Sequence, residues 1–367
     1  EPVLPGPDWV KVKTRYGGIC GSDMNVLFLD FNLAVAPLIS LPFVLGHENV
    51  GVVAEVGRQV QGFAPGDRVV ADPLFSCITR GIEEPCEFCQ RGEYARCQNL
   101  SNGDLSPGLG IGFCRDTGGS WGESFVAHQS QLVPVPGNVS DEHALMADPV
   151  SAPLRAVLRR VPGDGDTVVV LGAGTAGLCT IAALRAVGSG SRVIVVAKHP
   201  FQGELARGYG ADQAIILEDG DLLQEVARAT GGRVLDSVLG KRLLVGGADV
   251  VYECVGSRSS VDGALRFARA GGRVVLLGMS AILKRVDWTS IWLNELDVSG
   301  YVWGDEETYQ GRRVRTVQLA LEWMAEGRLD LARMVTHRFA LHECRKAFAV
   351  AARKARHCAV KPAFTFD

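Results

Sequence analysis

Four cysteines cluster in the first third of this chain. They are Cys77, Cys86, Cys89 and Cys97, spaced Cys-x8-Cys-x2-Cys-x7-Cys. In a chain of 367 residues, such local clustering is typical of a metal site rather than of a disulfide scaffold. Four thiolates complete a tetrahedral zinc and leave no open position, so the cluster predicts a structural zinc. Reduced thiols without a metal are the alternative, because the gap after Cys77 is long.

Two further candidate metal ligands, Cys20 and His47, precede this cluster. They lie in the motifs Cys20-Gly21-Ser22-Asp23 and Gly46-His47-Glu48, both expected in turns that follow apolar segments. Cys and His are ligands that suit zinc. Asp23 is a candidate to hydrogen-bond the ring nitrogen of His47 that faces away from the metal. A lone Cys or His is more often a packed core residue, so the spacing alone leaves both interpretations open.

A glycine-rich turn in the second half predicts a dinucleotide site. The sequence Gly172-Ala173-Gly174-Thr175-Ala176-Gly177 directly follows the apolar run Val168–Leu171 and opens an Ala/Leu-rich helix. In that context the first Gly makes the tight turn, the second admits the pyrophosphate and the third lets helix pack on strand. The helix N-terminus then offers free N–H groups to the phosphates. The candidate contacts are Gly172, Gly174, Thr175, Ala176 and Gly177.

The end of the next expected strand bears on the choice of cofactor. An acidic residue is expected there to hold an adenosine ribose 2′-hydroxyl. The strand instead ends in Ala197-Lys198-His199, which removes the carboxylate and supplies a cation for a 2′-phosphate. The pattern therefore favours NADP over NAD, with Lys198 and His199 as candidate contacts. A solvated surface lysine is the alternative.

These motifs need two kinds of scaffold. Short apolar runs bounded by Gly, Pro or Asp predict a β-rich barrel or sandwich over the first 150 residues, followed by helix from Ser140 to Arg160. Strand and helix then alternate, which predicts a doubly wound parallel sheet, an α/β fold. The expected strands are Thr167–Leu171, Arg192–Val196, Gln213–Ile216, Val250–Cys254 and Arg273–Leu277. The expected helices include Ala176–Val187, Phe201–Tyr209, Ser260–Ala270 and a late one at about Arg315–Glu326.

Composition limits the partners. The chain carries 38 basic and 41 acidic residues, a net charge of −3, so no general attraction to nucleic acid is expected. Its apolar runs are too short to span a bilayer, and no secretory signal is visible. We therefore expect a cytoplasmic protein with no nucleic-acid or membrane partner. Because the sequence begins at Glu1, a leader stays open.

Taken together, the motifs resemble the medium-chain, zinc-dependent alcohol dehydrogenase superfamily, especially its polyol and threonine dehydrogenase branches. The resemblance rests on Gly18–Asp23, Gly46–Glu48, the Cys lobe 77–97, the glycine turn, Glu253–Gly256 and Thr336–Phe339. It implies a GroES-like β-rich catalytic domain over 1–152, a Rossmann domain over 153–301 and a segment 302–367 that returns to the catalytic domain. It also implies a homo-oligomer.

The resemblance further implies a catalytic zinc on Cys20 and His47. Asp148 is the third candidate ligand, with Glu48 as an alternative; a helix-start carboxylate is the other interpretation of Asp148. Three protein ligands would leave a position for the substrate oxygen, whose pKa the metal lowers. Ser22 resembles the hydroxyl that begins the family's proton relay.

Other cofactor contacts also rest on the resemblance. Val255, Gly256, Gly278 and Met279 follow expected strands at the edge where ligands bind in such folds. Lys361 is a weaker candidate for a phosphate contact. The implied function is hydride transfer between a nicotinamide cofactor and a secondary alcohol or ketone, such as a polyol, sugar derivative or amino alcohol. The alternatives are a zinc-free NADPH-dependent reductase of activated double bonds and a non-catalytic nucleotide-binding redox sensor.

Overall fold

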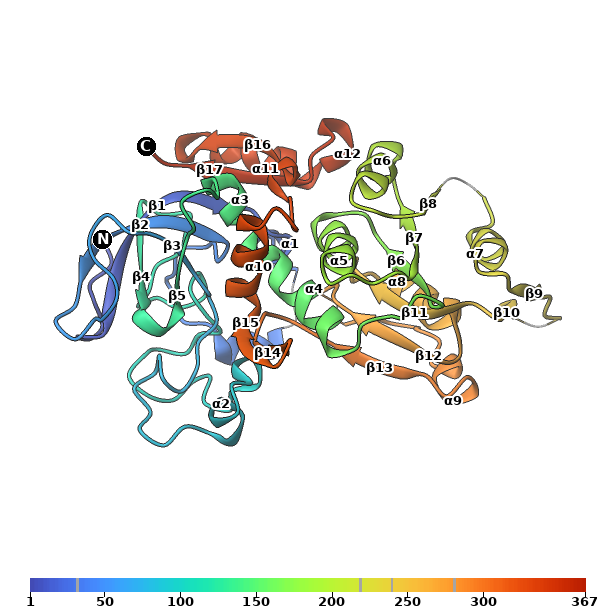
Figure 1. The fold of residues 1–367 in the computed structure, drawn as a ribbon, viewed down its shortest axis with the longest axis horizontal. Coiled ribbons are helices and arrows are strands. Elements are labelled where there is room, and N and C mark those ends of the chain that lie inside the picture. Colours follow the sequence, from blue (N-terminus) through green and yellow to red (C-terminus); the bar gives the residue numbers. More distant parts are fainter. Residues whose placement is uncertain (31–32, 218–219, 239, 280–281) are drawn as a thin grey trace. The chain divides into compact units, whose positions relative to one another are not determined.

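The computed structural model describes residues 1–30, 33–217, 220–238, 240–279 and 282–367 (Figure 1). The chain forms two compact units. The first unit is Glu1–Ser151 together with Trp303–Asp367, and the second is Ala152–Val302. The C-terminal residues therefore belong to the same unit as the N-terminal residues.

The first unit is built on a seven-stranded sheet in the order β16-β17-β1-β2-β3-β5, with β4 paired to β1. Strand β1 pairs antiparallel with β2, β4 and β17. Along β1, Val10, Val12 and Thr14 are buried while Lys13 and Arg15 are exposed, which is the alternation expected of a half-buried strand. The strands of this sheet are β1 (Trp9–Gly18), β2 (Asn49–Val56), β3 (Arg68–Ala71), β4 (Ser124–His128), β5 (Leu132–Pro134), β16 (Val335–Ala340) and β17 (Lys361–Thr365).

Short helices and one small hairpin connect and cover these strands. The hairpin is β14 (Glu306–Tyr309) with β15 (Arg312–Arg315). The α-helices are α1 (Gly21–Leu27), α2 (Glu87–Gln90), α3 (Asp141–Leu145), α10 (Thr316–Ala325), α11 (Cys344–Ala352) and α12 (Lys354–His357). The 3-10 helices are η1 (Leu33–Leu38), η2 (Tyr94–Arg96), η3 (Gln129–Gln131), η4 (Ala332–Met334) and η5 (Leu341–Glu343).

Two local predictions in this unit are wrong. The motif from Cys20 to Asp23 begins helix α1 instead of forming a turn, because the Asp23 carboxylate accepts a hydrogen bond from the Cys20 N–H and caps the helix. The helix that begins after Ser140 is interrupted at Met146 and resumes as α4 (Ala147–Arg159). Ser140 itself caps α3 as expected, since its Oγ accepts from the His143 N–H at 3.2 Å.

The second unit contains a six-stranded parallel sheet in the order β13-β12-β11-β6-β7-β8. Its first strand lies in the middle and the chain winds outward in both directions, which is the doubly wound topology (Figure 1). The strands are β6 (Thr167–Leu171), β7 (Arg192–Ala197), β8 (Gln213–Ile216), β11 (Ala248–Glu253), β12 (Ala268–Leu276) and β13 (Asp297–Gly300). A separate hairpin joins β9 (Arg233–Leu235) and β10 (Leu243–Val245).

The helices of this unit are α5 (Thr175–Ala186), α6 (Pro200–Gly208), α7 (Leu222–Thr230), α8 (Arg258–Phe267) and α9 (Thr289–Leu293). Helices α5, α6 and α8 lie close to the predicted helices, whereas α7 and α9 were not predicted. The expected helix Ser260–Ala270 ends early, because residues from Ala268 onward already belong to β12. The described part of the chain contains no helix long and apolar enough to cross a membrane.

Candidate metal centres and dinucleotide site

Three predicted residues meet in the first unit. Ligand atoms of Cys20, His47 and Glu48 all lie within 4.8 Å of one another. Cys20 caps α1, and His47 and Glu48 lead directly into β2. A thiol, an imidazole and a carboxylate held this close are a ligand set that suits zinc.

Asp23 fixes the orientation of His47. Its Oδ1 lies 3.0 Å from Nδ1 of His47, and its Oδ2 accepts from the Cys20 N–H at 3.0 Å. Burial alone would lower the pKa of His47, but the Asp23 carboxylate outweighs burial and raises that pKa well above its usual range. With Nδ1 engaged, Nε2 is the nitrogen available to a metal. The predicted contact between these two residues is therefore present in the structure.

Glu48 belongs to a buried ion pair. Its Oε1 contacts Nζ of Lys361 from β17, and both side chains are 2% exposed. Burial would lower the pKa of Lys361, but the Glu48 charge outweighs it and the pKa is raised. Oε2 of Glu48 is buried and has no hydrogen-bond partner among the residues that the structure describes. An orphaned buried carboxylate oxygen beside Cys20 and His47 fits a cation.

The structure gives Lys361, the weaker candidate for a phosphate contact, a different partner. Its side chain is buried in the first unit and its ammonium group is paired with Glu48. The sequence offers no local signal for this pair, because its two members are 313 residues apart.

Asp148 lies in the first turn of α4 and is 6% exposed. Its pKa is raised to about 7, mainly by burial. The charges of Glu48 and Asp72 also raise the pKa, and His47 lowers it. Its Oδ1 has no hydrogen-bond partner within the described ranges. The group of mutually close ligand atoms contains Glu48 and not Asp148. Of the two candidates for the third ligand, the structure brings only Glu48 together with Cys20 and His47.

The remaining surroundings of this site are partly apolar. Ser22 is half-buried in α1, next to Asp23. The ring of Phe113 stacks on His47 at 5.5 Å between centroids, and Trp303 meets Phe113 edge-on at 6.5 Å. Phe113 was not predicted, because nothing in its sequence neighbourhood distinguishes it from a core aromatic residue.

The four clustered cysteines also meet. Their sulfur atoms all lie within 4.8 Å of one another, and Sγ of Cys77 is 3.7 Å from Sγ of Cys97. Zn–S bonds of about 2.3 Å at tetrahedral angles hold sulfurs about 3.8 Å apart, so the spacing fits zinc. A hydrogen bond from Cys89 lowers the pKa of Cys97 to about 5, which favours the thiolate that a metal requires.

N–H groups surround these sulfurs. The Cys86 N–H and the Asn99 side-chain amide each donate to Sγ of Cys77 at 3.3 Å, and the Asn99 N–H donates to Sγ of Cys97 at 3.4 Å. Such donors stabilise thiolates. Asn99 was not predicted, and only its position two residues after Cys97 could have pointed to it.

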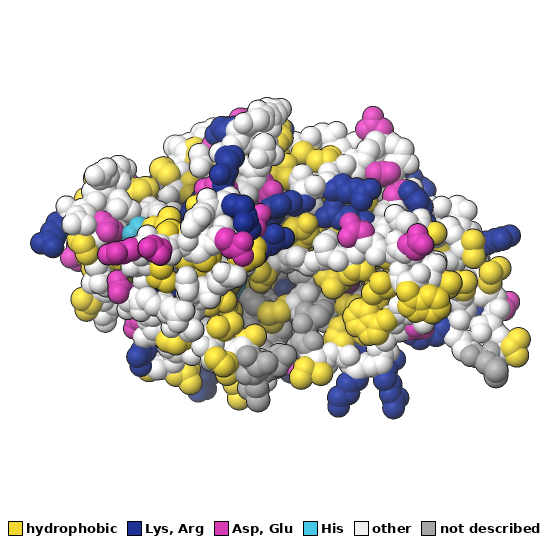
Figure 2. Space-filling view, turned by 90° about the horizontal axis from the view of Figure 1, so that it is seen from below, with side chains coloured by type: hydrophobic (Ala, Val, Ile, Leu, Met, Phe, Trp, Pro, Cys, Tyr) yellow, Lys and Arg dark blue, Asp and Glu magenta, His cyan; other side chains and the backbone are white. Residues whose placement is uncertain are grey.

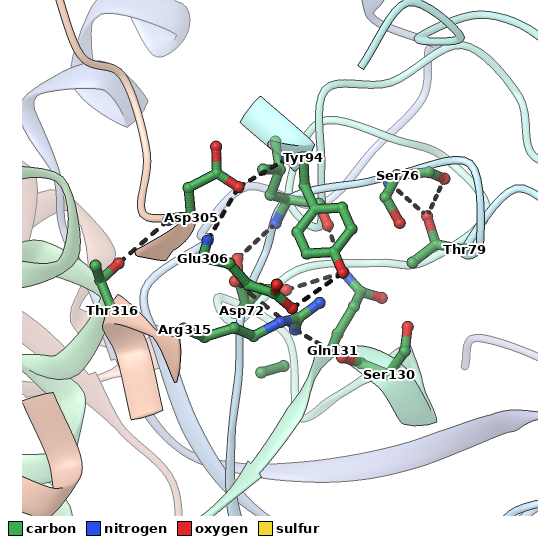
Figure 3. A network of polar contacts seen from close by, with 12 residues as sticks. Asp72, Ser76, Thr79, Tyr94, Ser130, Gln131, Asp305, Glu306, Arg315 and Thr316 are labelled. Atoms are coloured by element: carbon green, nitrogen blue, oxygen red, sulfur yellow. Dashed lines mark hydrogen bonds and ion pairs between the residues drawn. The ribbon is translucent and has the colours of Figure 1, made fainter. Parts of the chain in front are cut away.

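A polar network ties the Cys lobe to the C-terminal part of the first unit (Figure 3). The Tyr94 N–H donates to Asp305 Oδ1 at 2.7 Å, and the Tyr94 hydroxyl donates to Glu306 at 3.2 Å. The guanidinium of Arg315 lies 5.0 Å from the centre of the Tyr94 ring and donates to the Ser130 carbonyl at 2.6 Å. The lobe is thereby fastened to the β14–β15 hairpin.

The predicted dinucleotide turn joins β6 to α5 in the second unit. Gly172 has a φ of +94°, a left-handed conformation that favours glycine, and Gly174 is the N-cap of α5. Thr175, Ala176 and Gly177 form the first turn of that helix. Gly177 packs so close to the Gly172 carbonyl that a Cβ would collide with it. The turn fits a pyrophosphate at a helix N-terminus.

The other predicted cofactor residues lie at the carboxyl edge of the same sheet. Lys198 follows β7 and is exposed, and His199 is the N-cap of α6. Val255 and Gly256 follow β11, and Gly278 and Met279 follow β12. Buried Glu253, at the end of β11, was not predicted as a site residue.

Comparison with known proteins identifies both halves of the chain. The alcohol dehydrogenase GroES-like domain model matches residues 6–137, and the zinc-binding dehydrogenase model matches residues 176–318. L-idonate 5-dehydrogenase of Vitis vinifera is 31% identical over 357 residues, covering 96% of this chain and 87% of the relative. Sorbitol dehydrogenase of Arabidopsis thaliana is 30% identical over 360 residues, covering 96% and 88%. A Sinorhizobium meliloti 1021 protein described as a zinc-binding dehydrogenase, solved with NADP, has a TM-score of 0.77 at 28% identity, covering 99% and 94%.

Proposed function

The chain belongs to the zinc-dependent medium-chain alcohol dehydrogenase superfamily, in the branch of the polyol and threonine dehydrogenases, and from that membership we propose which residues carry its reaction. The family resemblance and the α/β fold with a GroES-like domain are confirmed. The protein is an oxidoreductase that acts on a secondary alcohol with a nicotinamide cofactor. A zinc-free reductase or a non-catalytic sensor is not favoured.

The proposed catalytic centre is Cys20, His47 and Glu48. The observation that carries it is the orphaned Oε2 of Glu48, buried beside a thiol and an imidazole within 4.8 Å. Zinc held there would act as a Lewis acid that lowers the pKa of the substrate hydroxyl. Asp148, with a pKa raised to about 7, is proposed as a nearby carboxyl group outside the ligand set.

The chain's own residues would orient the ligands and move the proton. Asp23 holds the proton on Nδ1 of His47, which leaves Nε2 as a ligand atom. Lys361 neutralises Glu48, so the buried charge does not have to be matched by the metal alone. We propose that the Ser22 hydroxyl passes the substrate proton outward. Asn25, on the same helix, cannot accept it at neutral pH, so the next acceptor would be water.

The four-cysteine lobe is proposed as a second, closed zinc site. Its thiols leave no position for a substrate, so its zinc would stabilise the lobe and take no part in the reaction.

The proposed cofactor is NADP. The exposed Lys198 after β7, in a position where no carboxylate follows the strand, supports a 2′-phosphate contact. Lys198→Ala is expected to raise the KM for NADP about tenfold and to leave the KM for NAD within about twofold, as the loss of one charge contact predicts. A wild-type kcat/KM for NAD equal to or above that for NADP would contradict this preference.

A cytoplasmic homo-oligomer is also proposed. Strand β13 is the edge of the sheet, and the nearby Trp288 and Trp292 are 53% and 71% exposed. Figure 2 shows hydrophobic side chains gathered on the face seen there. An open sheet edge beside apolar side chains favours pairing with a second copy. Light scattering of the purified chain would test this, and a monomer at micromolar concentration would contradict it.

The test of the proposed function combines two measurements on one preparation. Elemental analysis is expected to give two zincs per chain, and the same sample is expected to reduce NADP with sorbitol, L-idonate, L-threonine or a related secondary alcohol. One zinc with activity would place the metal in the catalytic centre and leave the Cys lobe empty. Activity that survives complete zinc removal would contradict the proposal.

A further inference from the structure

Glu253 is a fully buried carboxylate that the catalytic proposal does not use. It is the last residue of β11 and is 0% exposed. A carboxyl group buried at the carboxyl edge of a sheet is costly unless its oxygens are hydrogen-bonded. The partners of its hydrogen bonds therefore indicate which parts of the chain Glu253 holds in place.

Glu253 holds two loops at once. Its side-chain Oε1 accepts from the N–H groups of Val255 and Gly256 at 2.9 and 2.8 Å. Its main-chain carbonyl accepts from the N–H groups of Leu277 and Gly278 at 2.8 and 2.9 Å. One residue thus fixes the loop that follows its own strand and the loop that follows β12.

The two loops interlock around this carboxylate. Gly256 has a φ of +82°, and a Cβ there would lie 2.6 Å from the Met279 carbonyl oxygen. A Cβ on Gly278 would lie 2.6 Å from Oε2 of Glu253. That Oε2 has no hydrogen-bond partner within the described ranges. The two loops are therefore packed closely against each other and against the carboxylate.

The two loops that Glu253 holds lie next to the dinucleotide turn. Val255 packs against Gly172, because a Cβ on that glycine would lie 2.5 Å from Cγ2 of Val255. The side chains of Val255 and Met279 are 53% and 48% exposed. Ligands of doubly wound sheets bind outside the carboxyl ends of the strands, where the winding reverses between β6 and β11. Two half-exposed apolar side chains at this edge suit the flat nicotinamide ring.

We propose that Glu253 is a positioning residue for the nicotinamide half of the cofactor. Its carboxylate holds the N–H groups of Val255 and Gly256 and packs against Gly278, while its main-chain carbonyl holds the Leu277 and Gly278 N–H groups. Val255 and Met279 thereby form an apolar platform beside the glycine turn. Glu253 itself does not touch the cofactor. The inference rests on the proposed dinucleotide site and extends it to the half of the cofactor that the glycine turn does not hold.

The experiment compares the whole cofactor with a fragment that lacks nicotinamide. We would measure the Kd of NADPH by fluorescence and that of 2′-phospho-ADP-ribose by calorimetry for the wild type, Glu253→Ala and Glu253→Gln. Glu253→Ala is expected to raise the Kd of NADPH about tenfold or more, with the fragment within about twofold. Gln keeps an oxygen acceptor, so Glu253→Gln is expected to stay within about threefold of the wild type for both.

Asp249 supplies a matched control at the opposite end of β11. Its Oδ2 accepts from the Thr167 N–H at 2.8 Å, so Asp249→Ala also removes a structural hydrogen bond from this strand. It is expected to lower the Tm while leaving both Kd values within about twofold of the wild type. Equal losses of NADPH and fragment affinity in Glu253→Ala would overturn the inference, as would a Gln variant as weak as Ala. If Glu253→Ala does not fold, Glu253→Asp, which withdraws the acceptor by one methylene, must show the same selective loss.

The binding readout separates this inference from the proposed reaction. A chain that shows the selective loss but oxidises no alcohol would support the role of Glu253 and contradict the dehydrogenase chemistry. A wild type that binds neither NADPH nor the fragment would overturn the dinucleotide site and the inference together.

Discussion

The two candidate metal centres of the first unit are built in opposite ways. The Cys lobe takes four identical ligands from within 21 residues of sequence. The centre at His47 takes three different ligands, and its buried counter-charge, Lys361, comes from the last strand of the sheet. A locally assembled site can fold around its metal, whereas the second depends on the whole sheet. The difference shows that the four-cysteine group is a local unit of the sequence, whereas the group at His47 is a product of the whole fold.

Their surroundings differ in the same sense. N–H donors face the sulfurs of the lobe, whereas carboxylates face the centre at His47: Asp23 on its ring, Glu48 within the ligand group and Asp148 nearby. N–H donors offset part of the negative charge of thiolates that surround a metal. Several buried carboxyl groups at the other centre are costly unless cations compensate them.

The largest expected difference concerns activity. His47→Ala is expected to lower kcat/KM at least about a thousandfold, because it removes a ligand of the proposed Lewis acid, which supplies several kcal/mol of transition-state stabilisation. The Kd for the dinucleotide is expected to stay within about twofold, since the glycine turn belongs to the other unit. Steady-state kinetics and cofactor fluorescence measure the two effects.

Cys86→Ser is the matched variant in the lobe. It is expected to lose one zinc per chain and several kcal/mol of stability while the remaining folded protein keeps kcat within about threefold. The division between a structural and a catalytic centre would fail if Cys86→Ser abolished kcat in protein that is still folded. It would also fail if His47→Ala left kcat unchanged.

The next largest effect is expected from the buried ion pair. In zinc-free protein, Lys361→Met removes the cation paired with the Glu48 carboxylate and is expected to lower the free energy of unfolding by about 3–5 kcal/mol. Lys361→Arg keeps the charge and is expected to lose much less. Urea unfolding measures both, and the double variant Lys361→Met/Glu48→Gln is expected to recover part of the loss. A loss below about 1 kcal/mol in Lys361→Met would contradict the stabilising role of the pair.

A smaller effect is expected from the residues that orient the ligands. Asp23→Asn weakens the hydrogen bond to Nδ1 of His47 and is expected to lower zinc affinity at that centre about 10–100-fold. Asn99→Ala removes an N–H donor from Cys77 and is expected to weaken only the zinc of the lobe. Chelator competition with two-step zinc release measures both. Loss of the same zinc in both variants would contradict the assignment of separate centres.

The sequence predicts what depends on local pattern. Strand β6 has the predicted bounds Thr167–Leu171, and the glycine turn opens α5 as expected, because a short continuous apolar run and a βα turn leave their signature within a few residues. Cys20 was misplaced in a turn because its helix is capped by Asp23, a contact that composition does not reveal. The role of Lys361 could not be identified, since sheet pairing brings it to its partner Glu48. Glu253 was not singled out, because nothing in the sequence shows that its carboxylate turns back onto the N–H groups of Val255 and Gly256.

The smallest expected effect is a pH dependence that separates the two regions in metal-free protein. Burial raises the pKa of Asp148 from 3.8 to about 7, so the folded state keeps a proton that the unfolded state has already released. Stability is then fully present below about pH 4 and is lost as pH rises toward 7, by at most about 1.4 kcal/mol per pH unit. Cys97 in the lobe has its pKa lowered from 9.0 to about 5, so its contribution rises with pH from 5 upward.

Because these two contributions have opposite signs, a difference measurement is needed. The free energy of urea unfolding is measured for the chelated wild type and for chelated Asp148→Asn at pH 5 and pH 6. From pH 5 to pH 6 the stability of the wild type is expected to fall by about 1 kcal/mol relative to that of the variant, because the contribution of the lobe is the same in both proteins and cancels. The raised pKa of His47 adds its own loss only above its usual value of 6.5, outside this interval. Equal slopes in the two proteins would mean that Asp148 is already ionised at pH 5, and its carboxylate would then be free to act as a metal ligand in place of Glu48.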